Sequence, residues 1–185
     1  MNPIAHLELS WLAAQPLRHR RDRILVAAAG VIPDVDGLSI LAGKDFYGTW
    51  HHVLTHGYVA AAVVTVAAAA AAKERVKTAA LALFTFHLHL MCDLVGSGPG
   101  WPLFYFWPTS DRSWYWSAQW NLASWQNSVI ATIASLACLA MAFPFRRTIV
   151  EIFSTKADAL VVKALWLRFR KARGRELGIL TETDR

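Results

Sequence analysis

Residues 53 to 72 contain no Asp, Glu, Lys or Arg. A helix rises about 1.5 Å per residue, so a run of this length crosses the roughly 30 Å hydrocarbon core of a bilayer. The runs 79–95 and 128–145 have a similar reach, and 55% of the chain is hydrophobic. The sequence therefore predicts an all-α, polytopic integral membrane helix bundle.

Residues 24–43 form a fourth apolar run, but Pro33 lies inside it beside Asp34 and Asp36. Proline lacks a backbone donor and disfavours helical geometry in the residue before it. We therefore expect a discontinuous first span over 24–43, followed by three continuous spans over 53–72, 79–95 and 128–145.

Basic clusters separate these apolar runs at residues 18–23, 73–77 and 146–147. If the four spans alternate in direction, all three clusters lie on one side, which the positive-inside rule makes cytoplasmic. The opposite side then receives the loops 44–52 and 96–127. The second loop holds six of the nine tryptophans, a pattern typical of an aromatic layer at the membrane interface.

After the last run, apolar residues recur at helical spacing among Lys and Arg: Ile149, Phe153, Leu160, Ala164 and Leu167. The pattern predicts a C-terminal amphipathic helix on the anionic inner leaflet, followed by a polar tail that frays beyond Gly174. We expect a membrane-embedded domain over residues 1–147 and this basic helix with its tail over 148–185.

The formal net charge is +6, but the basic residues bunch between apolar runs and do not form one stripe with interleaved aromatics. This favours membrane lipids and a small or lipid-like molecule as partners, and it argues against nucleic acid. Cys92 and Cys138 lie far apart in apolar runs, so neither a disulfide framework nor a thiolate metal site is predicted. Glu8 interrupts the amino-terminal segment, which also lacks a basic start, so no cleaved signal peptide is expected.

His and Asp residues stand at the edges of the apolar runs, where they are costly in hydrocarbon. The expected topology brings those from three segments to a common depth: Asp34 and Asp36, then His51, His52 and His56, then His89 and Asp93. His89 and Asp93 are four residues apart and share a helix face, as do His52 and His56.

Coordination of a divalent metal removes the cost of leaving imidazole and carboxylate bare. Because the set contains no Cys, it suits catalytic zinc, manganese or non-haem iron, and it is rich enough for two ions. A metal-activated water would then attack an ester or phosphoester, without a protein nucleophile. The general acid stays open between His87, His52 and a metal-bound water.

Four quoted stretches carry a family resemblance: "AHLELSWL", "IPDVDGL", "WHHVLTHG" and "HLMCDLVGSGPGWPLFYFWP". Together, from about residue 4 to residue 127, they resemble the YdjM-type membrane-bound metal-dependent hydrolases of the bacterial inner membrane. The resemblance implies the metal ligands His6, Asp34, Asp36, His51, His56, His89 and Asp93. Among these we expect Asp93, His89 and Asp36 to take part in catalysis.

The chain departs from the family's "HRGxTHS" form at His52, Val53 and Gly57, a change that affects contacts around the ligands more than the ligands themselves. His6 raises a conflict. Simple alternation of the spans leaves residues 4–14 on the cytoplasmic side, whereas the resemblance brings His6 to the outer metal site.

Less specific interpretations stand beside this one. Asp34 and Asp36 are also typical of a turn or a helix cap. His89 and Asp93 also suit a structural hydrogen-bonded pair. His87 also suits a packing role, and His52 suits a position at the membrane interface. A divalent-cation or proton transporter is a second functional class, since His and Asp within spans also build ion pathways. Clustering at one face, and not in a chain across the bilayer, argues against it. A non-catalytic regulatory protein whose metal only holds the fold is a third.

Overall fold

The computed structural model describes residues 1–176, and these fold into helices joined by loops, with no strand among them. The all-α prediction is therefore confirmed for the described part of the chain. The structure divides into two compact units, Met1–Ser135 and Leu136–Arg185. The last nine residues of the predicted tail, 177–185, lie outside the described residues.

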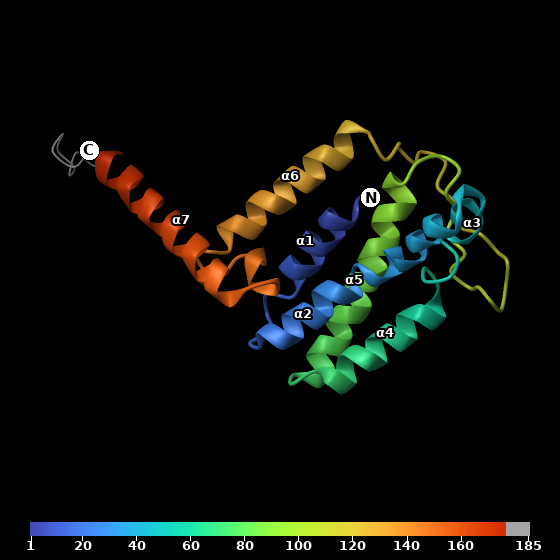
Figure 1. The fold of residues 1–185 in the computed structure, drawn as a ribbon, viewed down its shortest axis with the longest axis horizontal. Coiled ribbons are helices and arrows are strands. Elements are labelled where there is room, and N and C mark those ends of the chain that lie inside the picture. The colour runs from blue at the N-terminus through green and yellow to red at the C-terminus, as the bar shows by residue number, and fades with distance from the viewer. Residues whose placement is uncertain (177–185) are drawn as a thin grey trace. The chain divides into compact units, whose positions relative to one another are not determined.

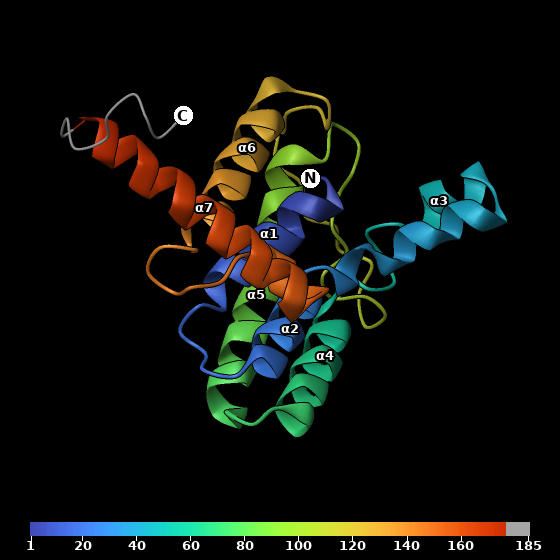
Figure 2. The same ribbon diagram turned by 60° about the vertical axis from the view of Figure 1, so that its left-hand side comes forward.

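The first unit contains α1 (Pro3–Ala13), α2 (Arg20–Ala29), the 3₁₀ helix η1 (Ile32–Ala42), α3 (Lys44–Trp50), α4 (Tyr58–Ala71), α5 (Arg75–Gly96) and the start of α6 (Trp125–Ala140). α5 is the central helix of this unit, because it contacts α1, α2, α4 and η1. α4 and α5 run side by side in both views (Figures 1 and 2).

Small side chains bring the helices of the first unit close together. Ala29, Ala68 and Ala82 form one buried cluster that joins α2, α4 and α5. Phe86 and Leu90 fill a second cluster on the next turns of α5, against α4. Close approach through alanine is how helices associate where no hydrophobic effect drives them together, as in a bilayer.

Of the described helices, only α5 is by itself long and apolar enough to cross a membrane: its 22 residues reach about 33 Å. α2 and η1 pass the same test only as a pair bent by 52°. α4 and α6 have 14 and 16 residues, because residues 53–57 are not helical and α6 ends at Ala140. The multi-pass topology predicted from four apolar runs is therefore not confirmed.

The helix break expected at Pro33 begins slightly earlier, since α2 ends at Ala29 and η1 starts at Ile32. Pro33 stands in the first turn of η1, where a missing backbone donor does no harm. The break turns Asp34 and Asp36 towards α5 and the 51–57 loop, which is how two carboxylates enter the interior of the unit.

Residues of the loop between α5 and α6, and of the first turn of α6, donate hydrogen bonds to the carbonyl groups at the end of α5. The Gln119 side-chain amide donates to the Asp93 carbonyl at 2.9 Å, and Asn127 donates to the Gly96 carbonyl at 2.8 Å. The Trp120 backbone amide donates to Val95 at 3.0 Å. These bonds satisfy carbonyls that a helix end leaves without partners, and they fix the turn that carries Asp93.

The second unit consists of the end of α6, a short 3₁₀ helix η2 (Ile149–Ile152) and α7 (Thr155–Glu176). Asp158 in the first turn of α7 accepts hydrogen bonds from the Thr148 amide and hydroxyl at 2.7 and 2.6 Å. This contact fixes the chain entering η2 against α7. The basic helix predicted after residue 148 is thus a 3₁₀ turn followed by α7.

Candidate metal centre

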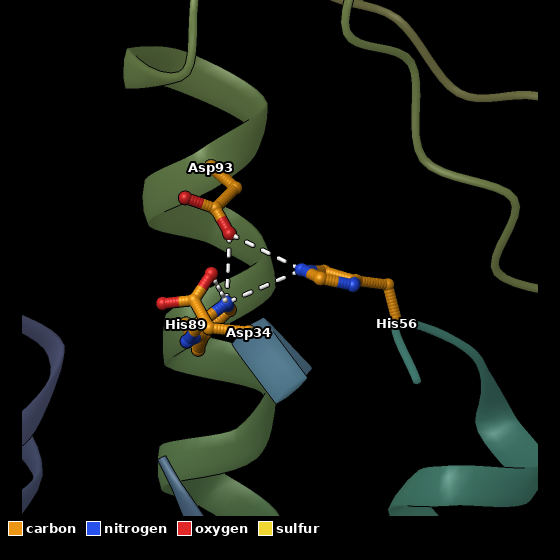
Figure 3. Close-up of side chains that lie close together, drawn as sticks. All are labelled: Asp34, His56, His89 and Asp93. Atoms are coloured by element: carbon orange, nitrogen blue, oxygen red, sulfur yellow. Dashed lines mark hydrogen bonds and ion pairs between the residues drawn. The ribbon is translucent and has the colours of Figure 1, made fainter. Parts of the chain in front are cut away.

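Four side chains from three segments converge inside the first unit: Asp34 of η1, His56 of the 51–57 loop, and His89 and Asp93 of α5 (Figure 3). Each offers one ligand atom, and these four atoms all lie within 4.8 Å of one another. The His56, His89 and Asp93 side chains are almost fully buried. Such a buried mixture of imidazole and carboxylate is chemically suited to bind a divalent metal.

His89 presents an unprotonated nitrogen to the cluster. Its Nδ1 lies 2.8 Å from the Gly30 carbonyl, which can only accept a hydrogen bond, so Nδ1 carries the proton. In neutral His89 the Nε2 lone pair then faces Asp93 Oδ2 at 2.7 Å. A lone pair against a carboxylate is repulsive, and a cation between them would remove the repulsion.

His56 repeats this arrangement. Its Nδ1 lies 2.9 Å from Asp36 Oδ2, and its Nε2 lies 3.4 Å from His89 Nε2 and 3.5 Å from Asp93 Oδ2. Two imidazoles thus use Nδ1 for an outer acceptor and turn Nε2 to one point, which is how metal-binding histidines are oriented. The residues present therefore fit a divalent ion.

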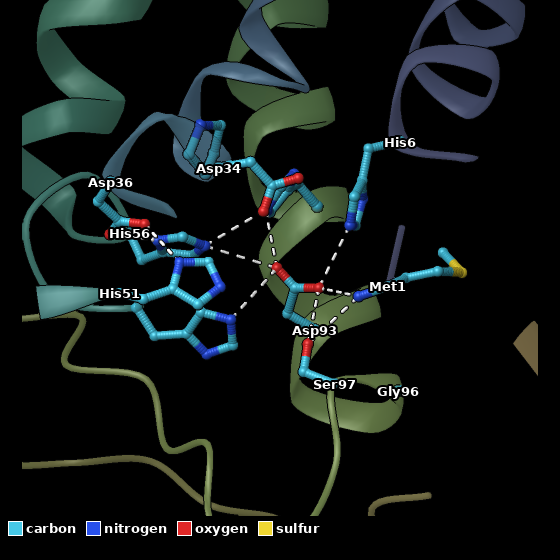
Figure 4. A network of polar contacts seen from close by, with 12 residues as sticks. Met1, His6, Asp34, Asp36, His51, His56, Asp93, Gly96 and Ser97 are labelled. Atoms are coloured by element: carbon cyan, nitrogen blue, oxygen red, sulfur yellow. Dashed lines mark hydrogen bonds and ion pairs between the residues drawn. The ribbon is translucent and has the colours of Figure 1, made fainter. Parts of the chain in front are cut away.

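The two oxygens of Asp93 have different surroundings (Figure 4). Oδ1 accepts from His6 Nε2 at 3.2 Å, from the Ser97 hydroxyl at 2.9 Å and from the Met1 amino group. Oδ2 has no hydrogen-bond donor among the described residues, and neither does the buried Oδ2 of Asp34. Buried carboxylate oxygens without donors are costly, so these atoms also point to a bound cation.

The structure places Asp36, His51 and His6 next to the four-residue cluster. Asp36 is buried, and its Oδ1 accepts from His51 Nδ1 at 2.7 Å while its Oδ2 serves His56. His6 stacks on His89, with ring centroids 3.7 Å apart. α1, which carries His6, lies against α5, so His6 reaches the site despite the side that simple alternation assigned to residues 4–14.

The remaining histidines near the site differ in their surroundings. His87 turns away, with Nδ1 2.8 Å from the Leu83 carbonyl and Nε2 2.9 Å from the Tyr105 hydroxyl. His52 is buried, and its Nε2 lies 4.0 Å from Asp93 Oδ2. Burial, followed by the nearby His56, lowers the pKa of His52 to about 3, so this imidazole is neutral at physiological pH.

A cavity of about 490 Å³ opens beside the cluster. Asp34, Asp93, His51 and His52 line its polar part, and its other walls include Leu38, Tyr47, Trp101 and Leu122. The volume lies within the range of small-molecule sites. A ligand in this cavity would contact both carboxylates of the cluster.

Several groups that support the site were not predicted. The Gly30 carbonyl orients His89, and Thr55 donates its amide to Asp36 at 3.4 Å. A side chain at position 30 has no room, because an added Cβ would lie 1.8 Å from Ser10 Oγ. Ser97 follows Asp93 by four residues, and this helical spacing was the one signal in the sequence that could have identified it.

Fold and site together define a helical protein with a His/Asp cluster that can bind a metal ion. The family model for the YdjM inner membrane protein matches residues 1–171. The chain belongs to this inner-membrane family, which agrees with the resemblance found in its sequence. Searches of curated proteins and of solved structures gave no match.

We expect Asp36→Asn to weaken metal binding by about 10- to 100-fold, the usual effect of losing a group that orients a metal-binding histidine. The substitution replaces one of the two acceptor oxygens that hold His51 and His56. Metal titration of the detergent-purified protein measures the change. Asp45→Asn removes the same charge from an exposed position in α3 and should leave the affinity unchanged. Equal affinities for the two variants would contradict the role given to Asp36.

Proposed function

We propose that this protein is a metal-dependent hydrolase of the inner membrane that cleaves an ester or phosphoester in a lipid-like substrate. One observation carries the proposal: the Nε2 atoms of His56 and His89, whose Nδ1 atoms face outer acceptors, meet two carboxylates beside a cavity. Two His and two Asp donors without Cys favour zinc, with manganese or iron as alternatives. A bound divalent ion supplies a Lewis acid and activates water at neutral pH.

The residues around the ligands keep them in place during such a reaction. Asp36 holds the His56 ring by its Nδ1 proton, and the Gly30 carbonyl holds His89 in the same way. His6 and Ser97 donate to one oxygen of Asp93, which leaves the other directed into the cluster. Asp93 and His89 thus act as ligands, while Asp36 acts through the histidines.

His51 is placed to transfer the proton. It lines the cavity, its side chain is 12% exposed, and its Nδ1 donates to Asp36 at 2.7 Å. A carboxylate on Nδ1 fixes the ring so that Nε2 can accept a proton from water and return it to the leaving group. We therefore propose that His51 acts as the general acid and base. The family resemblance instead implies that His51 is a metal ligand.

The cavity favours an amphiphilic substrate. Its polar side carries Asp34 and Asp93, and Leu38 and Leu122 on its walls are exposed apolar side chains. A phosphoester or ester group would lie at the carboxylates while an attached chain covers the apolar walls. A protein of the inner membrane meets such molecules at the bilayer surface.

A substrate panel tests the proposal with the detergent-purified protein. The panel contains p-nitrophenyl carboxylic esters, phosphomonoesters and phosphodiesters, each with a short and an octyl chain. We expect a co-purifying divalent metal and hydrolysis that is faster for the octyl member of one class. Metal-loaded protein that hydrolyses none of them, or that prefers the short chains throughout, would contradict the proposed function.

A further inference from the structure

We propose that the second unit binds the phosphate headgroup of an anionic lipid in a cavity on α7. The cavity has a volume of about 490 Å³ and lies where α7 meets the turn after α6. Three cationic side chains surround it: Arg146 from the turn, and Lys163 and Arg170 from α7. Trp166 forms one wall, and Ala159 and Val162 are among the apolar residues beneath.

The cations of this cavity have no opposite charge nearby. Within the described part of the chain, no carboxylate lines the cavity, and no ion pair involves Arg146, Lys163 or Arg170. Lys163 and Arg170 are seven residues apart and therefore lie on one face of α7. Three like charges around one cavity repel one another unless an anion lies between them. Phosphate suits such a site, because its oxygens accept charge-assisted hydrogen bonds from Arg and Lys.

The tryptophan wall is fixed before any ligand arrives. Trp166 Nε1 donates to the Ala142 carbonyl at 3.1 Å, which holds the ring. The Arg146 guanidinium lies 4.1 Å from the centre of that ring, a cation–π contact. Arg146 also has a positive φ of 55°, an uncommon conformation for a residue other than glycine. The turn therefore presents the guanidinium to the cavity at little further entropic cost.

Adjacent apolar residues favour a lipid over free phosphate as the ligand. Leu160 and Leu167 are seven residues apart on α7 and are 69% and 57% exposed, so they form an apolar row on one face of the helix. Leu167 also lines the cavity, so the basic site and this apolar row share an edge. A ligand with a phosphate and acyl chains satisfies both surfaces. This is a discrete site, distinct from the diffuse attraction of a basic helix to an anionic leaflet.

Lipid titration of the full-length protein in a nonionic detergent tests this site by native mass spectrometry. The probes are dioleoyl phosphatidylglycerol, dioleoyl phosphatidylcholine and inorganic phosphate. We expect the protein to retain phosphatidylglycerol most tightly. The double variant Lys163→Gln/Arg170→Gln should weaken that binding by about tenfold or more, and Arg146→Gln should weaken it in the same direction.

The matched control is Arg168→Gln/Lys171→Gln, which removes two charges from α7 outside the cavity and away from the face of Lys163 and Arg170. Its effect should stay below about threefold, because exposed charges contribute little when screened. Circular dichroism of every variant should match that of the unaltered protein. If both double variants lost phosphatidylglycerol binding equally, the binding would depend on general surface charge and not on a discrete site, which would overturn the proposal. Equally tight phosphatidylcholine or inorganic phosphate would overturn the choice of an anionic lipid.

Discussion

Asp93→Asn is expected to lower metal affinity by about 100-fold or more and to abolish hydrolysis, because it removes a charged ligand and not only its support. Asp93 Oδ2 lies 2.7 Å from His89 Nε2 and 3.5 Å from His56 Nε2, at the centre of the cluster. The fold should survive, because Gln119 bonds the backbone carbonyl of residue 93 and asparagine keeps a side-chain oxygen for His6. Metal content and turnover measure the effect.

Two comparisons sharpen this prediction. Asp111→Asn removes a carboxylate from an exposed loop position and should keep both metal and activity. The melting temperature of the metal-free Asp93→Asn variant should not fall below that of metal-free unaltered protein, since the buried Oδ2 of Asp93 has no hydrogen-bond donor there. An Asp93→Asn variant that kept its full metal content would show that Asp93 is not a metal ligand.

Metal removal should abolish activity reversibly and lower the thermal stability. A ligand that binds only the folded state stabilises it by about 4 kcal/mol when its free concentration is about a thousandfold above Kd. For a chain of this size that corresponds to a shift of roughly 10 °C in melting temperature. Chelation followed by thermal denaturation measures the loss, and added zinc should restore both properties.

The Asp93→Asn variant is the control for this experiment, because its weaker metal binding means that a chelator should lower its melting temperature by less than half as much. Activity that survives in metal-free protein would show that the metal is not required. A covalent adduct trapped on a serine or cysteine during turnover would show that the nucleophile is a protein side chain and not metal-activated water. Either result would contradict the proposed mechanism.

The sequence predicted the helical class and the inner-membrane family because both follow from long apolar runs and from short motifs. The four spans that it predicted are not confirmed, because hydropathy cannot distinguish a helix from an apolar loop. Val53 and Leu54 are apolar, but they belong to the loop that brings His56 to the cluster, so α4 starts only at Tyr58. The loop that positions His56 therefore shortens α4.

Motifs brought the correct residue types together, but they did not separate the four clustered residues from those that support them. In the sequence, Asp34 and Asp36 are equivalent members of one motif. In the structure, η1 directs Asp34 to the cluster and Asp36 to His51 and His56. The contact between His89 and the Gly30 carbonyl could not be predicted from the residue type, because every residue has a backbone carbonyl. Such roles depend on the bend between α2 and η1, which needs three-dimensional information.

The order in which the chain is synthesised gives the His6–Asp93 contact a further consequence. Its partners are 87 residues apart in sequence, and His89 also belongs to α5. His6, Asp34, Asp36 and His56 therefore leave the ribosome before the carboxylate and imidazole that complete the cluster.

During that interval these polar groups lack their partners, and polar groups without partners are costly in hydrocarbon. Stable burial of the α1 and η1 ends must therefore wait for α5 to be made and to pack beside α2. The His/Asp cluster is thus completed in one late step, the packing of α5. A variant that delays this helix should expose the earlier segments to quality-control proteases before its metal content can be measured.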